Sequence, residues 1–374
     1  MADNKDKKVL NVPALRFPEF TGEWKSVHLE DVAEFQKKRI SSDLLNNNNY
    51  ISTENILQNF EGIQYSSSIP TNTNVIEYQK GDILLSNIRP YLKKVWFSDR
   101  KGGCSADVFV LRGDKCDQHF LYYVIASDRF INYVMSGVKG VKMPRGDKNQ
   151  MKKYAFSIPT NTEQRKIAKF LSMLDERIKL QNKIIEDLKK LKSAISERLF
   201  NAIKGDVVVL EDIGDVVKGK QINGEFLSES GKYYVMNGGI EPSGFYNDYN
   251  VEANTISISE GGNSCGYVQF NACPFWSGGH CYTIQNTTDN VKTEYLYQFL
   301  KSKESEIMKL RIGSGLPNIQ KKDLAKFKIT IPNISEQKVI SAFLSSFERK
   351  ADVEMNFVNL LLEEKQYLLR QMFI

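Results

Sequence analysis

The chain has 374 residues, of which 41% are hydrophobic and 26% charged, with a net charge of +6 and a pI near 8.8. This length is typical of two or three domains, and the mild basic excess is compatible with a nucleic-acid partner. No apolar run approaches the roughly 20 residues of a membrane span, and the N-terminus lacks the apolar core of a secretory signal. We therefore predict a cytoplasmic protein with no membrane partner.

The chain begins with a lead segment, residues 1–24, that contains NVPALRFPEFTGEW. A globular segment follows over residues 25–157. It has alternating strand patterns in DILLSNI and DVFVLR, an amphipathic helical pattern in FLYYVIASDRFINYVM, and the loop sequence GVKGVKMPRGDK. Alternation of period two predicts strands, whereas apolar spacing of three and four residues predicts helices. The segment is therefore expected to be a mixed α+β domain.

A long helix is predicted over residues 158–203, and its sequence returns later in the chain. IPTNTEQRKIAKFLSML begins at Ile158, IPNISEQKVISAFLSSF begins at Ile331, and the offset of 331 − 158 = 173 holds without a gap to the C-terminus. A recurrence of this length indicates one structural unit used twice. In each copy a hydroxyl, Thr162 or Ser335, is expected to cap a helix of about 38 residues, roughly 57 Å long.

Apolar residues recur in both copies with the alternating steps of a heptad seam, which predicts an antiparallel coiled coil within the chain. Each seam is interrupted twice, by Gln181 and Lys192 in the first copy and by Glu354 and Lys365 in the second. We expect Lys192 to face Glu354 and Gln181 to face Lys365, because a lone buried lysine is costly. The alternative is that these polar residues are solvated at frayed helix ends.

Between the two helices, residues 204–330 form a second globular segment that echoes the first; residues 331–374 form the second helix. VLEDIGDVVKGKQI resembles HLEDVAEFQKKRI, YLYQFLKS resembles FLYYVIAS, and the RIGSGLPNIQKK loop resembles GVKGVKMPRGDK, always in the same order. The patterns TISISE and HCYTIQ again predict strands. We therefore predict two similar α+β domains, separated by the two long helices in a pseudo-two-fold repeat, with one scaffold carrying two different surfaces.

The loops of both domains combine glycine, proline, amides and cations. Lysine and arginine neutralise phosphates, and Arg, Asn and Gln hydrogen-bond to base edges. A single surface cation is normally just solvated, so the argument depends on their clustering in matched loops. In the first domain the expected DNA-binding residues are Lys37, Lys38, Arg39, Arg89, Lys93, Lys94, Lys142 and Arg145, beside the aromatics Tyr91 and Trp96. In the second they are Lys218, Lys220, Ser314, Asn318, Gln320 and Lys321.

Catalytic and metal-binding signatures are missing from the sequence. It contains no GxxxxGK[ST] phosphate loop, no NPPY-type methyltransferase motif, and only three histidines, none in a triad pattern. The five cysteines form no CxxC pair, and the gaps among Cys265, Cys273, His280 and Cys281 match no common zinc spacing. We predict a protein without catalytic residues, metal or cofactor of its own.

Several features follow one another in order along the chain: NVPALRFPEFTGEW, the LEDVAEF-type start of each half, GDILLS, the Gly…Pro loop ending in Ile-Pro, and the Glu-Gln that heads each helix. This ordered set resembles the specificity subunit of type I DNA restriction–modification systems. The resemblance covers nearly the whole chain. It implies two target-recognition domains, similar in fold to the DNA-recognition domain of adenine methyltransferases, each binding one half of a split, asymmetric site in double-stranded DNA.

The same resemblance implies that the paired helices set the gap between the half-sites and dock two methyltransferase subunits, with two motor-nuclease subunits joining for cleavage. It also implies that S-adenosylmethionine, ATP and Mg are bound by those partners. The lead segment is expected to pack near the end of the last helix. A protein-binding scaffold of two adaptor domains on a coiled-coil stalk is the main alternative; a stand-alone nuclease or methyltransferase is disfavoured by the missing motifs.

Overall fold

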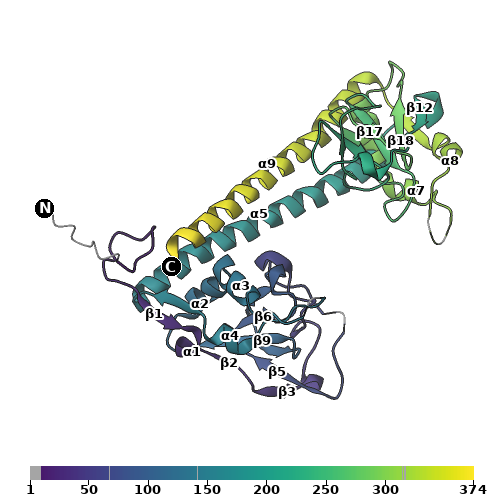
Figure 1. Ribbon diagram of the computed structural model, residues 1–374. Helices are drawn as coiled ribbons and strands as arrows, with labels where there is room; N and C mark the ends of the chain where they lie inside the picture. Colours follow the sequence, from purple (N-terminus) through teal and green to yellow (C-terminus); the bar gives the residue numbers. More distant parts are fainter. Residues whose placement is uncertain (1–9, 67, 141, 314, 316) are drawn as a thin grey trace. The chain divides into compact units, whose positions relative to one another are not determined.

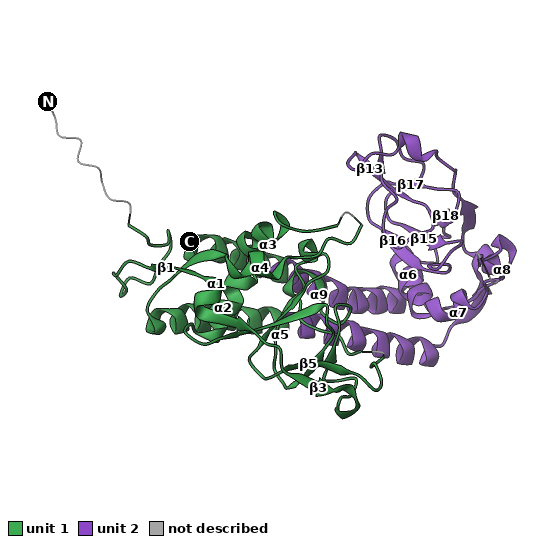
Figure 2. Ribbon diagram, turned by 60° about the horizontal axis from the view of Figure 1, so that its bottom comes forward, with its two compact units in different colours: residues 1–180, 358–374 green, residues 181–357 purple. Residues whose placement is uncertain are grey.

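The computed structural model describes residues 10–66, 68–140, 142–313, 315 and 317–374. It divides into two compact units (Figure 2): unit 1 comprises Met1–Leu180 with Val358–Ile374, and unit 2 comprises Gln181–Phe357. Each unit holds one mixed α+β domain and parts of two long helices, α5 (Asn161–Ala202) and α9 (Ile334–Met372), which Figure 1 draws as uninterrupted ribbons. No described helix is long and apolar enough to cross a membrane.

The domain of unit 1 contains two four-stranded sheets and a two-stranded pair. The first sheet has the order β2-β9-β6-β7 and is antiparallel; its strands are β2 (Ala33–Phe35), β9 (Val108–Gly113), β6 (Ile83–Ser86) and β7 (Val95–Phe97). The second has the order β3-β5-β8-β4 and is formed by β3 (Arg39–Ser41), β5 (Asn74–Tyr78), β8 (Gly102–Cys104) and β4 (Tyr50–Ile51). The antiparallel pair is β1 (Lys25–His28) with β10 (Ala155–Ile158).

Short helices complete unit 1: α1 (Leu29–Val32), α2 (Gln118–Ile125), α3 (Asp128–Met135), α4 (Lys148–Lys152), and the 3₁₀ turns Ser42–Leu44, Gln58–Phe60 and Pro90–Leu92. The single amphipathic pattern of residues 120–135 forms two helices, α2 and α3. Ser127 lies at this break, where its side chain accepts a hydrogen bond from the Phe130 N–H and so caps the start of α3.

The domain of unit 2 repeats the main sheet. Its order β12-β18-β15-β16 is formed by the antiparallel strands β12 (Asp215–Lys218), β18 (Cys281–Gln285), β15 (Thr255–Ser259) and β16 (Val268–Asn271). A three-stranded sheet contains β14 (Phe245–Tyr246), β13 (Tyr233–Met236) and β17 (Trp276–Ser277), and the terminal pair is β11 (Asp206–Val209) with β19 (Lys328–Ile331). The helices are α6 (Thr293–Ser302), α7 (Glu304–Met308) and α8 (Lys321–Ala325), with 3₁₀ turns at Leu210–Asp212 and Gly224–Phe226.

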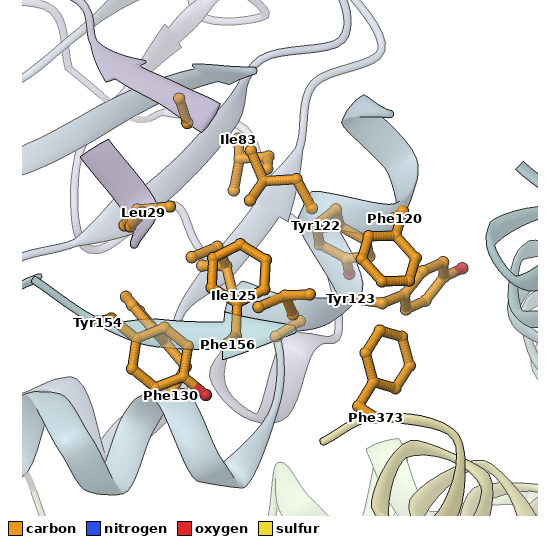
Figure 3. Packing of buried hydrophobic residues seen from close by; sticks show 14 of the residues in the cluster. Leu29, Ile83, Phe120, Tyr122, Tyr123, Ile125, Phe130, Tyr154, Phe156 and Phe373 are labelled. Atoms are coloured by element: carbon orange, nitrogen blue, oxygen red, sulfur yellow. The ribbon is translucent and has the colours of Figure 1, made fainter. Parts of the chain in front are cut away.

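The hydrophobic core of each unit joins its domain to the helices. In unit 1 the ring of Phe373, directly after α9, lies 5.2 Å from that of Phe120 on α2 (Figure 3), in a cluster that includes Leu171 of α5. In unit 2 the Phe200 ring of α5 lies 5.9 Å from that of Tyr295 on α6. Since Phe373 is the repeat copy of Phe200 (200 + 173 = 373), the duplicated helix ends perform the same packing role twice.

Both long helices begin one residue before the predicted capping hydroxyls, at Asn161 and Ile334. The Glu163 N–H lies 3.5 Å from Thr160 Oγ1, and the Glu336 N–H donates to Asn333 Oδ1 at 3.0 Å. Thr160 and Asn333 are the capping residues because each immediately precedes the first helical residue and its side chain reaches the third helical N–H. Thr162 and Ser335 lie inside the helices, so the predicted caps were wrong.

The predicted pairing of the polar seam residues was also wrong, although the antiparallel direction holds within unit 2. Gln181 hydrogen-bonds to Glu354, its own repeat copy, and Lys192 forms a 2.6 Å ion pair with Glu348. Glu348 precedes Glu354 by six residues, or about 9 Å along the helix axis. In an antiparallel pair of equal sequences, local two-fold symmetry brings the residue that lies on the axis opposite its own copy. The seam lysine therefore pairs with an acid outside the expected layer.

The same ion pair occurs in unit 1 between Lys365 and Asp175, at 2.5 Å. Lys365 and Asp175 are related to Lys192 and Glu348 by the offset of 173. In unit 1 the Tyr123 hydroxyl of α2 donates to Asp175 at 2.8 Å. In unit 2 Gln298 of α6 donates to Glu348 at 2.9 Å. In each unit an acidic side chain therefore links one long helix, the lysine of the other, and the domain.

Candidate nucleic-acid interface

Two loops of unit 1 that are far apart in the sequence are joined through their backbones. The loop after β6 carries Arg89, and the loop before α4 carries Pro144 and Arg145. The Arg89 N–H donates to the Pro144 carbonyl at 2.8 Å, and the Gly146 N–H donates to the Asn87 carbonyl at 3.1 Å. An isolated β-bridge also pairs Ile88 with Arg145. The structure therefore brings together two of the loops for which we predicted DNA-binding residues from the sequence.

Unit 2 contains the same pair of loops with different side chains. The Gly262 N–H donates to the Pro317 carbonyl at 3.0 Å, and the Ile319 N–H donates to the Glu260 carbonyl at 2.9 Å. Each bond joins the repeat copies of the residues bonded in unit 1, at the offset of 173. The bridge between Gly261 and Asn318 likewise repeats the one between Ile88 and Arg145. One backbone arrangement thus presents two side-chain sets, with Asn318 in the position of Arg145.

The backbone of Arg89 is in the left-handed region, with φ = 49°, and its copy Gly262 has φ = 74°. Glycine adopts this region without steric cost, whereas other residues lose roughly 1–2 kcal/mol. Lys93, at the end of the same loop, is also left-handed, with φ = 53°. Residues held in costly backbone conformations tend to gather at functional sites. The exposed Arg89 side chain is therefore the strongest candidate for a binding residue in this loop.

The other predicted cations of the β6–β7 loop are engaged within unit 1. Lys93 forms a 2.7 Å ion pair with Asp128, and Lys94 Nζ donates to the Thr53 carbonyl at 2.8 Å. Burial lowers the pKa of Lys94 from its usual value. Of the two aromatics beside them, Tyr91 is exposed, whereas Trp96 belongs to the core. Within the described residues Arg89 has no ion-pair partner, unlike Lys93.

The remaining predicted cations of unit 1 divide in a similar way. Arg145 Nη1 lies 3.1 Å from an Asp107 carboxylate oxygen, and Lys38 pairs with Glu77 at 2.7 Å. Arg39 donates to the Asn74 carbonyl at 3.1 Å, at the start of β3. Lys37, Arg39 and Lys142 are exposed, and the described residues provide none of them with an ion pair.

In unit 2 the predicted residues lie around the second loop pair. Lys218 Nζ forms a 2.6 Å ion pair with Glu260, and Gln320, which precedes α8, donates to Asn318 Oδ1 at 3.2 Å. Lys220 and Lys321 are exposed. Ser314 lies outside the described residues. The amide side chains of Asn318 and Gln320 are thus adjacent to one another in the second loop of the pair.

The structure adds site residues that were not predicted. Asn87 Oδ1 and Glu260 Oε2 are buried acceptors at copied positions, and neither accepts a hydrogen bond from the described residues. Glu260 Oε1 forms the ion pair with Lys218 and accepts a hydrogen bond from the Tyr282 hydroxyl at 3.1 Å, whereas Oε2 lies 3.6 Å from His280 Nδ1. The fixed offset of 173 is the sequence signal that could have paired these two positions. No group of three metal-ligating side chains occurs in the described part of the chain.

A further unpredicted cation, Lys148, follows the second loop of the pair. Lys148 begins α4, and its Nζ lies 4.7 Å from the centre of the Phe35 ring. Burial, followed by the charge of Lys37, lowers the pKa of Lys148. The charges of Lys37 and Lys148 therefore repel one another. Such a set of cations and amides can hold phosphates and hydrogen-bond to base edges.

The fold and the two loop pairs define a class of protein in which one duplicated scaffold presents two different recognition surfaces. The chain belongs to the type I restriction modification DNA specificity domain family, whose model matches residues 21–190 and 204–361.

Named relatives agree with this family. A type I restriction enzyme specificity subunit (MjaVIII) of Methanocaldococcus jannaschii is 24% identical over 94% of this chain and 91% of its own length. A protein named as a type I specificity subunit in Mycoplasma pneumoniae is 34% identical over 42% of each chain, and one in Mycoplasma genitalium is 32% identical over 41% of each. The match thus spans about two fifths of the length of these last two relatives.

The crystal structure of a type I restriction–modification system S subunit from M. genitalium has the same fold. It superposes with a TM-score of 0.66 at 20% identity, covering 97% of this chain and 99% of that chain. A chain from a structural study of complex assembly and conformational transition in a type I system superposes with a TM-score of 0.57 at 19% identity, covering 92% of this chain and 96% of that chain.

Proposed function

We propose that this chain is the DNA-sequence-specificity subunit of a type I restriction–modification complex, and that each unit binds one half of a bipartite, asymmetric DNA site. The observation that carries the proposal is the duplicated loop pair: the same backbone hydrogen bonds recur in both units, while Arg89 and Arg145 are replaced by Gly262 and Asn318. A change of side chains on a constant frame is what two different half-sites require, because base edges are recognised by side-chain chemistry.

The physical benefit of a split site is that two weak contacts combine. Each wrong base pair in a half-site costs roughly 1–3 kcal/mol, which is modest for a domain that contacts few base pairs. Linking the domains makes the second contact intramolecular, so the two half-site energies add. The helices α5 and α9 would set the number of unread base pairs between the half-sites.

This chain would have no catalytic role, in line with the specificity function of its family. Methylation of an adenine requires that the base be flipped out of the duplex into an enzyme pocket. We propose that two methyltransferase subunits supply this chemistry with S-adenosylmethionine. Two motor-nuclease subunits would use ATP and Mg for cleavage. The protein would act on double-stranded DNA in the cytoplasm.

The test is to sequence genomic methylation in the host with the gene present and deleted. We expect one bipartite adenine-methylated motif to disappear on deletion and to return when the gene is restored. Exchanging residues 206–331 for those of a relative should then alter one half of the motif and leave the other half intact. If the host motifs are unchanged and the chain, assembled with its methyltransferase, shows no salt-sensitive duplex binding, the scaffold alternative would replace this proposal.

A further inference from the structure

The lead segment of unit 1 binds to the start of α5 through one arginine. Arg16 Nε and Nη2 donate to the two carboxylate oxygens of Glu163 at 2.7 and 2.8 Å. Trp24 Nε1 lies 3.3 Å from the same carboxylate, and Glu163 is 0% exposed. Paired hydrogen bonds of this kind are among the stronger side-chain contacts in proteins. Glu163 is therefore the anchor that holds the lead segment on the helix.

Apolar and backbone contacts extend this attachment along the first turns of α5. The Phe17 ring lies 5.9 Å from that of Phe170 and 4.5 Å from Lys166 Nζ. Lys166 also forms an ion pair with Glu19, and the Leu15 N–H donates to the Gln371 carbonyl of α9 at 3.0 Å. The lead segment thus covers the surface formed by the start of α5 and the end of α9 in unit 1.

The copied surface in unit 2 is uncovered. The repeat places Glu336 where α5 has Glu163, Val339 where it has Lys166, and Phe343 where it has Phe170. Glu336 is exposed and has no ion-pair partner among the described residues, and Val339 and Phe343 are 69% and 46% exposed. An open groove of about 460 Å³ lies here, lined by Leu199, Ala202, Ile203, Ser335, Glu336, Val339 and Ile340. Apolar side chains dominate it, with one carboxylate among them.

We propose that this groove binds an extended segment of a partner protein that carries an arginine flanked by apolar residues. The arginine would pair with Glu336 as Arg16 pairs with Glu163. Because Val339 replaces Lys166, the residue corresponding to Glu19 would be apolar in the partner segment. This assignment concerns protein assembly and does not depend on the DNA-binding proposal.

A second copy of this chain is a poor occupant, because its own lead segment is already engaged. Arg16 would have to leave Glu163 uncompensated in a buried position, and Trp24, which is 3% exposed, would have to leave the core. Removing one partner of a buried charged pair commonly costs about 3–5 kcal/mol. The segment is therefore expected to come from a different protein.

The experiment uses the full chain and a fluorescent peptide with the sequence of residues 11–24 in which Glu19→Leu has been introduced. We expect saturable 1:1 binding that weakens about tenfold or more with Glu336→Gln or Val339→Asp in the chain, or Arg16→Ala in the peptide. Glu211→Gln, an exposed acid outside the groove, is the matched control and should leave binding unchanged. The peptide that retains Glu19 should bind more weakly.

Three results would overturn the proposal. The first is no binding by a folded chain. The second is binding that ignores Glu336→Gln and Val339→Asp but increases when Arg16→Ala vacates the surface in unit 1, which would mean exchange with the chain's own lead segment. The third is self-association of the peptide-free chain in sedimentation equilibrium that Glu336→Gln abolishes, which would make a second copy the occupant.

Discussion

Replacing Arg89 with glycine should separate binding from stability at the loop pair. Arg89 has a left-handed backbone, which costs a residue with a side chain roughly 1–2 kcal/mol. Arg89→Gly removes that cost but increases the freedom of the unfolded chain by about 0.5–1 kcal/mol. The backbone hydrogen bond from residue 89 to Pro144 can persist, as the equivalent bond from Gly262 shows. The free energy of unfolding should therefore stay the same or rise by up to about 1.5 kcal/mol.

DNA binding should weaken in the same variant. If Arg89 contacts a phosphate, its loss should reduce the slope of log K against log salt concentration by about 0.9. If it hydrogen-bonds to a base, affinity should fall by about 1–3 kcal/mol, or roughly 5- to 150-fold, for the cognate site alone. The reciprocal change, Gly262→Arg, enters open space, because no atom lies within 4 Å of the position of its Cβ. It should cost about 1 kcal/mol of stability and increase the salt slope.

The assay combines chemical denaturation with fluorescence anisotropy, using the chain assembled with its methyltransferase and the duplex motif found from genomic methylation. Lys115→Gln, an exposed lysine before α2, controls for the loss of one charge. Asn72→Gly, at another left-handed position with φ = 51°, controls for the backbone effect. Unchanged affinity and salt slope in Arg89→Gly would show that Arg89 does not contact DNA. A loss of stability above about 2 kcal/mol would refute the backbone argument.

Three further predictions concern the helices. Glu348→Gln and Asp175→Asn should each lower the free energy of unfolding by about 1–2 kcal/mol. The two losses should be nearly additive in the double variant, because the two networks share no residue. Chemical denaturation that detects a loss for only one of the variants would contradict the equivalence of the two networks. Gln164→Ala and Gln337→Ala should each lower the free energy of unfolding by about 1–3 kcal/mol, with the exposed Asn182→Ala as the control. Each buried amide oxygen accepts a hydrogen bond from the backbone N–H of the residue that immediately precedes α2 or α6. Inserting one heptad into one long helix should change the spacer in the methylated motif or abolish binding, and an unchanged spacer would refute the proposal that the helices set it.

The repeat, the long helices and the two α+β domains could be predicted from the sequence, because each depends on local or periodic information. The helices have no internal proline or glycine, and their apolar spacing persists over many turns. Strands such as β6 and β15 were located because alternation and β-branched residues mark them within a few residues. Over the long helices, an offset without gaps also determines which residues of the two copies correspond.

Pairing between distant residues was decided only by the tertiary structure. The seam positions of Gln181 and Lys192 were visible in the sequence, but their partners depend on where local two-fold symmetry places one helix against the other. Likewise, the cations of the loops were visible, whereas the engagement of Lys93 by Asp128 and the exposure of Arg89 follow from how the loop turns. Local sequence specifies which elements form, but which side chains remain free to bind DNA depends on contacts between residues far apart in the chain.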